Sequence, residues 1–192
     1  MCWSAEGSLA TGSLGMILAA LAWYYKTVDP VIWIFAVTYT SMQFVEYFLW
    51  KNLNNPAGNE FWSKVGALNI IMQPVILAFL IKKPELRNKI IGAYLLAMLV
   101  GNYFNPLVFK TTVGENGHLN WHWVFDHKTL WGPLWVIAFF TPMIITKHWG
   151  LFGFSFILAA TSFYFNVKFG TASSYWCWLA VSLWLAALAR LV

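Results

Sequence analysis

PVIWIFAVTYTSMQFVEYFLW, residues 30–50, is an apolar run that carries a single charged side chain, Glu46. A helix needs roughly 17 to 25 mostly apolar residues to cross the hydrocarbon core of a bilayer. A run of this length and composition therefore predicts a membrane-spanning helix.

Similar apolar runs recur along the chain, and charged or helix-breaking residues fill the gaps between them. We predict seven spans, at about 8–25, 30–50, 61–81, 90–109, 130–146, 149–167 and 175–192. The fifth and sixth runs are short and nearly continuous, so six spans with a re-entrant pair are an alternative. The expected fold is an all-α, polytopic transmembrane helix bundle that forms one domain over residues 1–192.

The composition independently indicates a membrane protein. Hydrophobic residues make up 60% of the chain, charged residues make up 10%, and the mean hydropathy is +0.62. Soluble domains carry roughly 25% charged residues, so soluble globular enzymes, disordered chains, disulfide-rich secreted modules and collagen-like fibres are excluded. The Lys and Arg residues lie in the gaps and form no basic face, so we expect no nucleic-acid partner. The chain has no phosphate-binding glycine loop and no nucleophile elbow, and this absence argues against an enzyme.

The distribution of Lys and Arg predicts the orientation, because cytoplasmic loops carry an excess of both residues. With alternating spans, seven of the 12 lie on one side, and four of these seven occupy the short segment from Lys82 to Lys89. The other side holds five: Lys51, Lys64, Lys110, Lys128 and Lys168. We therefore expect an integral, multi-pass protein with its N-terminus outside and its C-terminus in the cytosol.

Glu46 is the one acidic residue inside a predicted span, and Gln43 precedes it by three positions, on the same helix face. An ionisable group in a span costs several kcal/mol unless it is paired, hydrated or neutral. The functional interpretation is a carboxyl that handles a proton or an ion at the bottom of an outward-facing vestibule. The alternative is a structural carboxyl that bonds to a neighbouring helix.

Other amides fall at a comparable depth. Asn69 and Gln73 share one face of the third span, and Asn102 and Asn105 lie three apart at the end of the fourth. The candidate pathway for a substrate or an ion comprises Gln43, Glu46, Asn69, Gln73, Asn102 and Asn105. Amides in membranes also serve simply as hydrogen bonds between helices, which is the structural alternative for each of them.

Pro74, Pro133 and Pro142 also lie within predicted spans. A proline lacks the backbone N–H, so it frees a carbonyl one turn earlier and kinks the helix. A freed carbonyl beside a cavity can coordinate a cation, although kinking alone is the commoner use.

Eight of the 13 tryptophans fall on the predicted outer side. They suggest a packed aromatic cap over the mouth of the bundle, whose central members are Trp3, Trp121, Trp123, Trp176 and Trp178. The alternative is an interfacial aromatic belt of the kind that flanks most membrane spans.

Both cysteines are also expected on the outer side. Cys2 precedes the first span, and Cys177 lies near the start of the last. If the helices close into a ring, the first and last spans are neighbours, which allows a disulfide or a thiol pair in an oxidising compartment. The alternative is two small buried hydrophobic side chains.

Three histidines lie in the long segment between Lys110 and Lys128, namely His118, His122 and His127. On a helix, His118 and His122 would face one metal ion, and residues 118–125 are amphipathic enough to lie flat in the interface. No third ligand follows at a fixed spacing, so no cofactor is expected beyond a weak candidate site for a transition metal.

The chain also resembles a family of small polytopic membrane proteins of unassigned activity. The start Met1-Cys2-Trp3-Ser4 and the pair Trp176-Cys177 at the opening of the last helix carry the resemblance. Further matches are Gln43 with Glu46, Gln73 with Pro74, and Trp121 with His122. The resemblance supplies no activity, and it implies that one set of residues belongs together: Cys2, Trp3, Gln73, Pro74, Trp121, His122, Trp176 and Cys177.

Three classes of function remain. The first is a small channel or transporter that conducts or binds an ion, a proton or a small polar solute. The second is a membrane redox or metal protein that uses Cys2, Cys177 and the loop histidines. The third is a non-catalytic structural or receptor-like subunit. The expected partners are the lipid bilayer and an ion or a small polar solute, with a homo-oligomer or a membrane complex as a further option.

Overall fold

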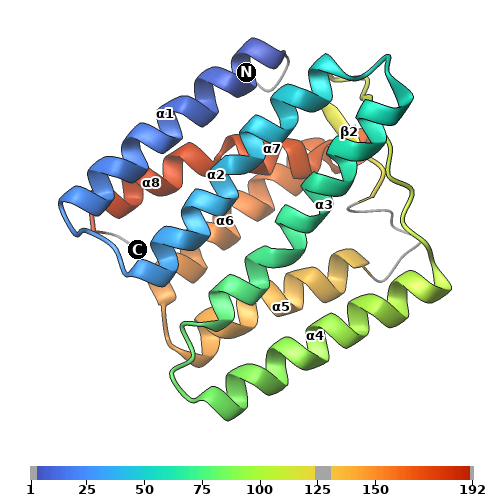
Figure 1. Ribbon diagram of the computed structural model, residues 1–192. Coiled ribbons are helices and arrows are strands. Elements are labelled where there is room, and N and C mark those ends of the chain that lie inside the picture. Colours follow the sequence, from blue (N-terminus) through green and yellow to red (C-terminus); the bar gives the residue numbers. More distant parts are fainter. Residues whose placement is uncertain (1–3, 124–130, 191–192) are drawn as a thin grey trace.

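The computed structural model describes residues 4–123 and 131–190, apart from the side chains of Cys177, Trp178 and Ala180. Consecutive long helices run roughly antiparallel to one another (Figure 1). They are α1 (Ala5–Tyr24), α2 (Pro30–Lys51), α3 (Pro56–Ala78), α4 (Pro84–Phe104), α5 (Trp131–Ile145), α6 (Trp149–Asn166), α7 (Ala172–Trp178) and α8 (Ala180–Leu188). A 3₁₀ turn η1 (Val167–Phe169) follows α6, and strands β1 (Thr111–Val113) and β2 (Leu119–Trp121) lie between α4 and α5.

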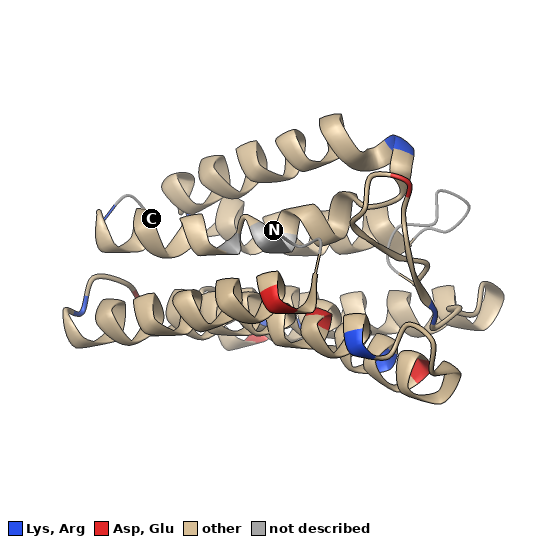
Figure 2. Cartoon of the chain, turned by 90° about the horizontal axis from the view of Figure 1, so that it is seen from above, with Lys and Arg blue, Asp and Glu red and all other residues tan. Residues whose placement is uncertain are grey.

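The helical class predicted from the sequence is confirmed. Among the described residues, three helical runs are long and apolar enough to cross a membrane: Ala5–Tyr24, Pro56–Ala78 and Trp149–Phe169. Figure 2 shows how few charged residues the helices carry. These features agree with a location in a membrane.

The long helices begin where local chemistry favours a helix start. Pro30, Pro56 and Pro84 occupy the first turns of α2, α3 and α4, where a backbone N–H has no partner within the helix. Asp29 and Asn55 cap α2 and α3 by accepting hydrogen bonds from backbone N–H groups. The helix starts can thus be explained from a few neighbouring residues each.

α2 is the central helix, since it packs against α1, α3, α7 and α8. Two glycines of α1 allow the closest of these approaches. A Cβ atom added at Gly15 would lie 2.4 Å from Thr40 Cγ2, and one at Gly12 would lie 3.0 Å from Gln43 Cβ. α1 also packs against α8, so the first and last helices are neighbours, as ring closure predicts.

Aromatic side chains fill the centre of the bundle. Phe35 and Tyr39 of α2 stack at 5.7 Å between ring centroids, and Phe35 meets Phe139 of α5 edge-on at 5.5 Å. Trp176 of α7 contacts Tyr39, Trp135 and Phe139. These five rings join α2, α5 and α7 into one core.

The prediction of an amphipathic helix at residues 118–125 is wrong for its described part, because Leu119–Trp121 forms strand β2. β1 and β2 pair antiparallel, with Thr111 opposite Trp121. Gly117 has a φ of 79°, and its N–H donates to the carbonyl of Gly114, which closes the turn of the hairpin. Asn-Gly turns and alternating apolar residues are typical of hairpins. In this segment they favour a hairpin over the amphipathic helix that the same residues could form.

The predicted last span, residues 175–192, also differs. Helix begins earlier, at Ala172, and is interrupted at Leu179 between α7 and α8. The hydroxyl of Ser182 donates to the carbonyl of Leu179, and this side-chain bond competes with the regular helical pattern at the break.

Candidate functional site

Glu46 lies at the contact between α2 and α7, and its exposed fraction is 0%. Ser174 of α7 donates a hydrogen bond from its Oγ to Glu46 Oε1 at 2.5 Å. Ser174 was not predicted as a site residue, because it lies one position before the predicted last span of residues 175–192. A buried carboxyl and a buried hydroxyl from distant parts of the chain thus form one pair.

Two further polar contacts tie α2 to the last two helices. The Tyr39 hydroxyl donates to the carbonyl of Trp176 at 2.8 Å, and Trp184 Nε1 donates to Thr40 Oγ1 at 2.8 Å. Gln43 is fully buried, and its Cβ lies close to Gly12 of α1. The α2 face around Glu46 is therefore enclosed by α1, α7 and α8.

Asn69 and Gln73 form a second polar group, between α3 and α2. Asn69 Nδ2 donates to the carbonyl of Thr38 at 3.1 Å and to Ser41 Oγ at 2.8 Å. Gln73 Nε2 donates to Asn69 Oδ1 at 3.1 Å. Gln73 is fully buried, and its Oε1 has no hydrogen-bond partner among the described residues.

Pro74 frees the carbonyl of Ile70, as the sequence predicts, and another helix supplies the missing donor. Trp135 of α5 donates from Nε1 to the Ile70 carbonyl at 2.7 Å. The Trp135 indole therefore satisfies this carbonyl with a hydrogen bond and links α3 to α5. Pro142 lies inside α5, and Pro133 falls in its first turn, where the loss of a backbone N–H costs little.

Asn102 and Asn105 lie apart from both polar groups, and both side chains are exposed at the end of α4. Asn102 Oδ1 accepts from the backbone N–H of Leu107, and the Asn105 carbonyl accepts from Trp131 Nε1. The structure thus divides the six predicted pathway residues among three places: the α2–α7 contact, the α2–α3 contact and the end of α4.

The polar contacts that attach the hairpin to the bundle were not predicted from the sequence. Asn59 of α3 pairs with the backbone of Thr111 through two hydrogen bonds of 2.9 Å, one in each direction. Ser63, one turn later, bonds the Thr111 hydroxyl at 2.9 Å. At the turn, Asn116 Nδ2 donates to Asn166 Oδ1 and Thr171 Oγ1. The spacing of Asn59 and Ser63 on one face was the only local signal.

The predicted histidine pair is not brought together on a helix. His118 is buried against Tyr175, with 5.6 Å between ring centroids, and this burial lowers the pKa of its imidazole. His122 is exposed and bonds to Thr112 Oγ1 at 2.9 Å. His127 lies outside the described residues. Within residues 4–123 and 131–190, no group of three or more His, Cys, Asp or Glu side chains is placed to hold a metal ion.

Three of the tryptophans predicted for the aromatic cap are described, namely Trp121, Trp123 and Trp176. Trp121 and Trp123 are buried and stacked, with 5.1 Å between ring centroids. Trp176 belongs to the central aromatic core rather than to a separate lid. The described part of the chain does not include Cys2, Trp3 or the side chains of Cys177 and Trp178. The predicted thiol pair therefore also lies outside it.

Two cavities lie near the hairpin. A narrow apolar one of about 20 Å³ is lined by residues that include Ala67, Met98, Trp123 and Trp135. A wider cleft of about 550 Å³ lies between the α2–α3 connection and β1. Neither is lined by Gln43, Glu46 or Gln73.

Comparisons with known proteins found no match among family models, curated proteins or solved structures. The geometry of the chain itself therefore carries any functional proposal, and membership of the family that it resembles stays a prediction.

Proposed function

We propose that the chain is a seven-span membrane protein with its N-terminus outside and its C-terminus in the cytosol. The helices α1 to α6, together with the α7–α8 pair, are the spans. Exposed aromatic residues at both ends of the helices support this, because aromatic side chains concentrate at the two membrane interfaces. Trp23, Tyr24 and Trp149 are exposed at one end, and Tyr103 and Tyr164 at the other.

Within this frame, the proposed activity is that of a small channel or transporter that moves a proton, an ion or a small polar solute past Glu46. The observation that carries the proposal is the fully buried Glu46 carboxyl, held by the hydroxyl of Ser174. Intramembrane carboxyls are costly and most often mark a pathway.

Under this proposal, the pathway is closed in the structure. Side chains of α2, α5 and α7 pack around the central aromatic core, and Glu46 has no exposed surface. Passage therefore requires α7 to separate from α2, which breaks the Ser174–Glu46 and Tyr39–Trp176 hydrogen bonds. The unpartnered Gln73 Oε1 offers a second polar group that such an opening would hydrate.

Flux into liposomes tests the proposal. Glu46→Gln should abolish proton or cation flux while the yield of folded protein stays nearly unchanged, since the amide keeps the shape of the carboxyl. Glu60→Gln is the matched control, because Glu60 is an exposed acid that pairs with Lys64 near the start of α3. Full flux in the Glu46→Gln protein would refute the role of this carboxyl.

A second candidate is a structural or receptor-like subunit, and the interhelical hydrogen bonds favour it. The Trp184–Thr40 and Asn69–Ser41 contacts lock helices together, which is the usual task of polar groups in membranes. Absence of flux in the wild-type protein, together with loss of folded protein in Glu46→Gln, would support this candidate over transport.

A further inference from the structure

Three helices end in the same uncommon way. Lys26, Lys147 and Arg190 have φ values of 50°, 59° and 57°, and they are the only residues other than glycine with positive φ in the described part of the chain. Lys26 and Arg190 follow the C-cap residues of α1 and α8, and Lys147 lies two residues after the last residue of α5. The left-handed conformation is unfavourable for a residue with a Cβ atom, so glycine or asparagine is usual at this position.

The hydrogen bonds confirm that these are regular helix terminations. At the end of α1, Lys26 N donates to the Trp23 carbonyl and Thr27 N to the Ala22 carbonyl, both at 3.1 Å. At the end of α5, Lys147 N donates to Ile144 and His148 N to Met143 in the same pattern. Both are Schellman motifs. A glycine would satisfy this backbone geometry with less strain, so the cationic side chain is the distinctive feature.

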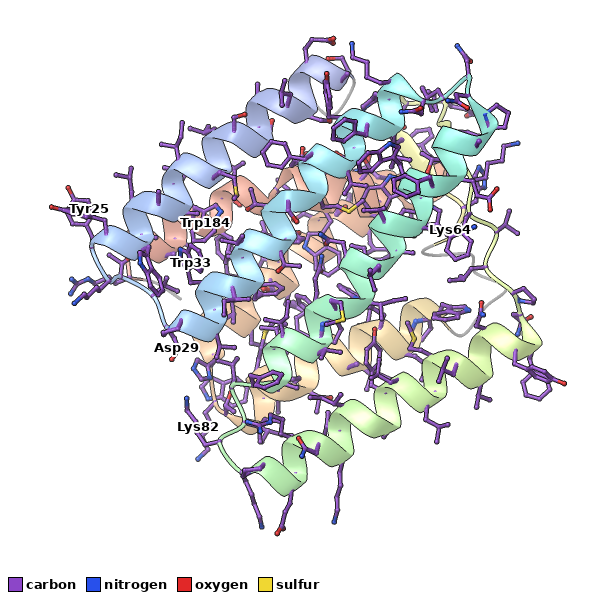
Figure 3. The ribbon with its side chains drawn as sticks, viewed as in Figure 1. Tyr25, Asp29, Trp33, Lys64, Lys82 and Trp184 are labelled. Atoms are coloured by element: carbon purple, nitrogen blue, oxygen red, sulfur yellow. The ribbon has the colours of Figure 1, made fainter. Side chains whose placement is uncertain are left out.

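All three cations lie at one end of the molecule, together with the connection between α3 and α4. Figure 3 labels Tyr25, Asp29 and Lys82 at this end and Lys64 at the opposite end. We call it the basic end, defined by its seven cations: Lys26, Lys82, Lys83, Arg87, Lys89, Lys147 and Arg190. Two acidic residues, Asp29 and Glu85, accompany them.

The opposite end is nearly balanced. Its described residues carry four cations, Lys51, Lys64, Lys110 and Lys168, against three acids, Glu6, Glu60 and Glu115. Two of these cations are engaged in ion pairs, Lys51 with Glu6 and Lys64 with Glu60. Lys26, Lys147 and Arg190 are exposed at the basic end. Exposed aromatic residues adjoin them, with Tyr25 beside Lys26 and Trp149 two residues after Lys147.

We propose that the basic end binds the phosphate headgroups of anionic phospholipids in the leaflet that it faces. The exposed aromatic rings place these helix ends at headgroup depth, and cations at a helix C-terminus are also favoured by the helix dipole. Juxtamembrane Lys and Arg are attracted to an anionic surface. The inference rests on the membrane assignment proposed above, but it is independent of a transport role for Glu46.

The test compares the association of spin-labelled phosphatidylglycerol and phosphatidylcholine with the purified full chain. The variants are Lys26→Gly with Lys147→Gly, and Lys26→Gln with Lys147→Gln. Both pairs should lower the preference for the anionic lipid about fivefold for each cation removed. The control pair, Lys110→Gln with Lys168→Gln, removes the same charge from the opposite end and should keep the wild-type preference.

Thermal unfolding in neutral lipid shows whether a variant pair loses lipid preference because its charge is removed or because its fold is damaged. The glycine pair should melt at or above the wild-type temperature, since it relieves the left-handed strain, whereas the glutamine pair should melt near it. An equal loss of preference in the control pair, or no preference in the wild type, would overturn the proposal. A lower melting temperature in the glycine pair would overturn the helix-end geometry that supports it. Flux through Glu46 is measured separately, so failure of either proposal leaves the other testable.

Discussion

Pro74 removes one backbone donor near the C-terminal end of α3, and a side chain from α5 takes its place. The Trp135 indole donates to the Ile70 carbonyl at 2.7 Å. Trp135 is buried and also stacks on Phe139, so one side chain both fills the core and completes the hydrogen bonding of α3. An unsatisfied carbonyl in this buried core would be costly, because it would lose its hydrogen bonds to water without gaining another partner.

We predict that Trp135→Phe lowers the free energy of unfolding by more than its lost ring volume explains. The unpaired Ile70 carbonyl should add about 1–3 kcal/mol to the loss. In a Pro74→Ala background, the new N–H of residue 74 can bond that carbonyl, so the additional loss should disappear. Denaturant unfolding in mixed micelles, run as a double-mutant cycle, measures the difference. An equal cost of Trp135→Phe in both backgrounds would contradict this coupling.

The freed carbonyl could be predicted from the sequence, because a proline acts on its own helix. Its partner could not, since Trp135 lies 65 positions away from Ile70 and no local pattern links them. Glu46 gives a second example: its position within an apolar run follows from the sequence, whereas Ser174, 128 positions away, is brought to it only by packing.

Between elements, the closest fit is that of α1 on α2. Gly15 faces Thr40, whose hydroxyl accepts from Trp184 of α8, so one threonine joins three helices. Small residues permit this approach, and membrane helices commonly associate through such contacts.

We predict that Gly15→Ala destabilises the bundle by about 1–3 kcal/mol, because the new Cβ would lie 2.4 Å from Thr40 Cγ2 and overpack the contact. Gly153→Ala in α6 is the control, since a Cβ there meets nothing within 4 Å. The control should gain up to about 1 kcal/mol from helix propensity. Thermal unfolding of the two variants measures both effects, and equal melting temperatures would disprove the close fit.

At the same scale, most helices lie near their predicted ranges, because the length of an apolar run and the breakers beside it are local properties. α2 was predicted at 30–50 and spans Pro30–Lys51. The hairpin was missed, because residues 118–125 fit both a helical and an alternating pattern. Contacts of Asn59 with Thr111, from a distant helix, favour the strand.

For the whole molecule, orientation is the property on which every statement about an outer side depends. The basic end faces the cytosol in the proposed topology, as the excess of Lys and Arg in cytoplasmic loops implies. Helix packing gathers three separate connections and the Arg190 helix end into that one end, although they are far apart in sequence (Figure 1).

We predict that a membrane-impermeant thiol reagent labels a cysteine placed at Glu115 in intact cells. A cysteine placed at Glu85 should be labelled only after permeabilisation. Both positions are exposed and lie at opposite ends, and Cys2→Ser with Cys177→Ser removes the natural thiols. The reverse pattern of labelling would invert the proposed orientation and would place the basic end outside.

The sequence by itself determined that the chain is helical and apolar enough for a membrane, that α2 and α6 begin at their predicted positions, and that Glu46 lies within an apolar run. These follow from local hydrophobicity and from the charged or helix-breaking residues between the runs. Only the tertiary structure decided that Ser174 meets Glu46, that Trp135 completes α3, and that Asn102 and Asn105 lie away from both polar groups. Such pairings depend on how helices that are far apart in sequence rotate and pack against each other. Helical periodicity predicts which residues share a face of a helix, but it does not predict which helix covers that face.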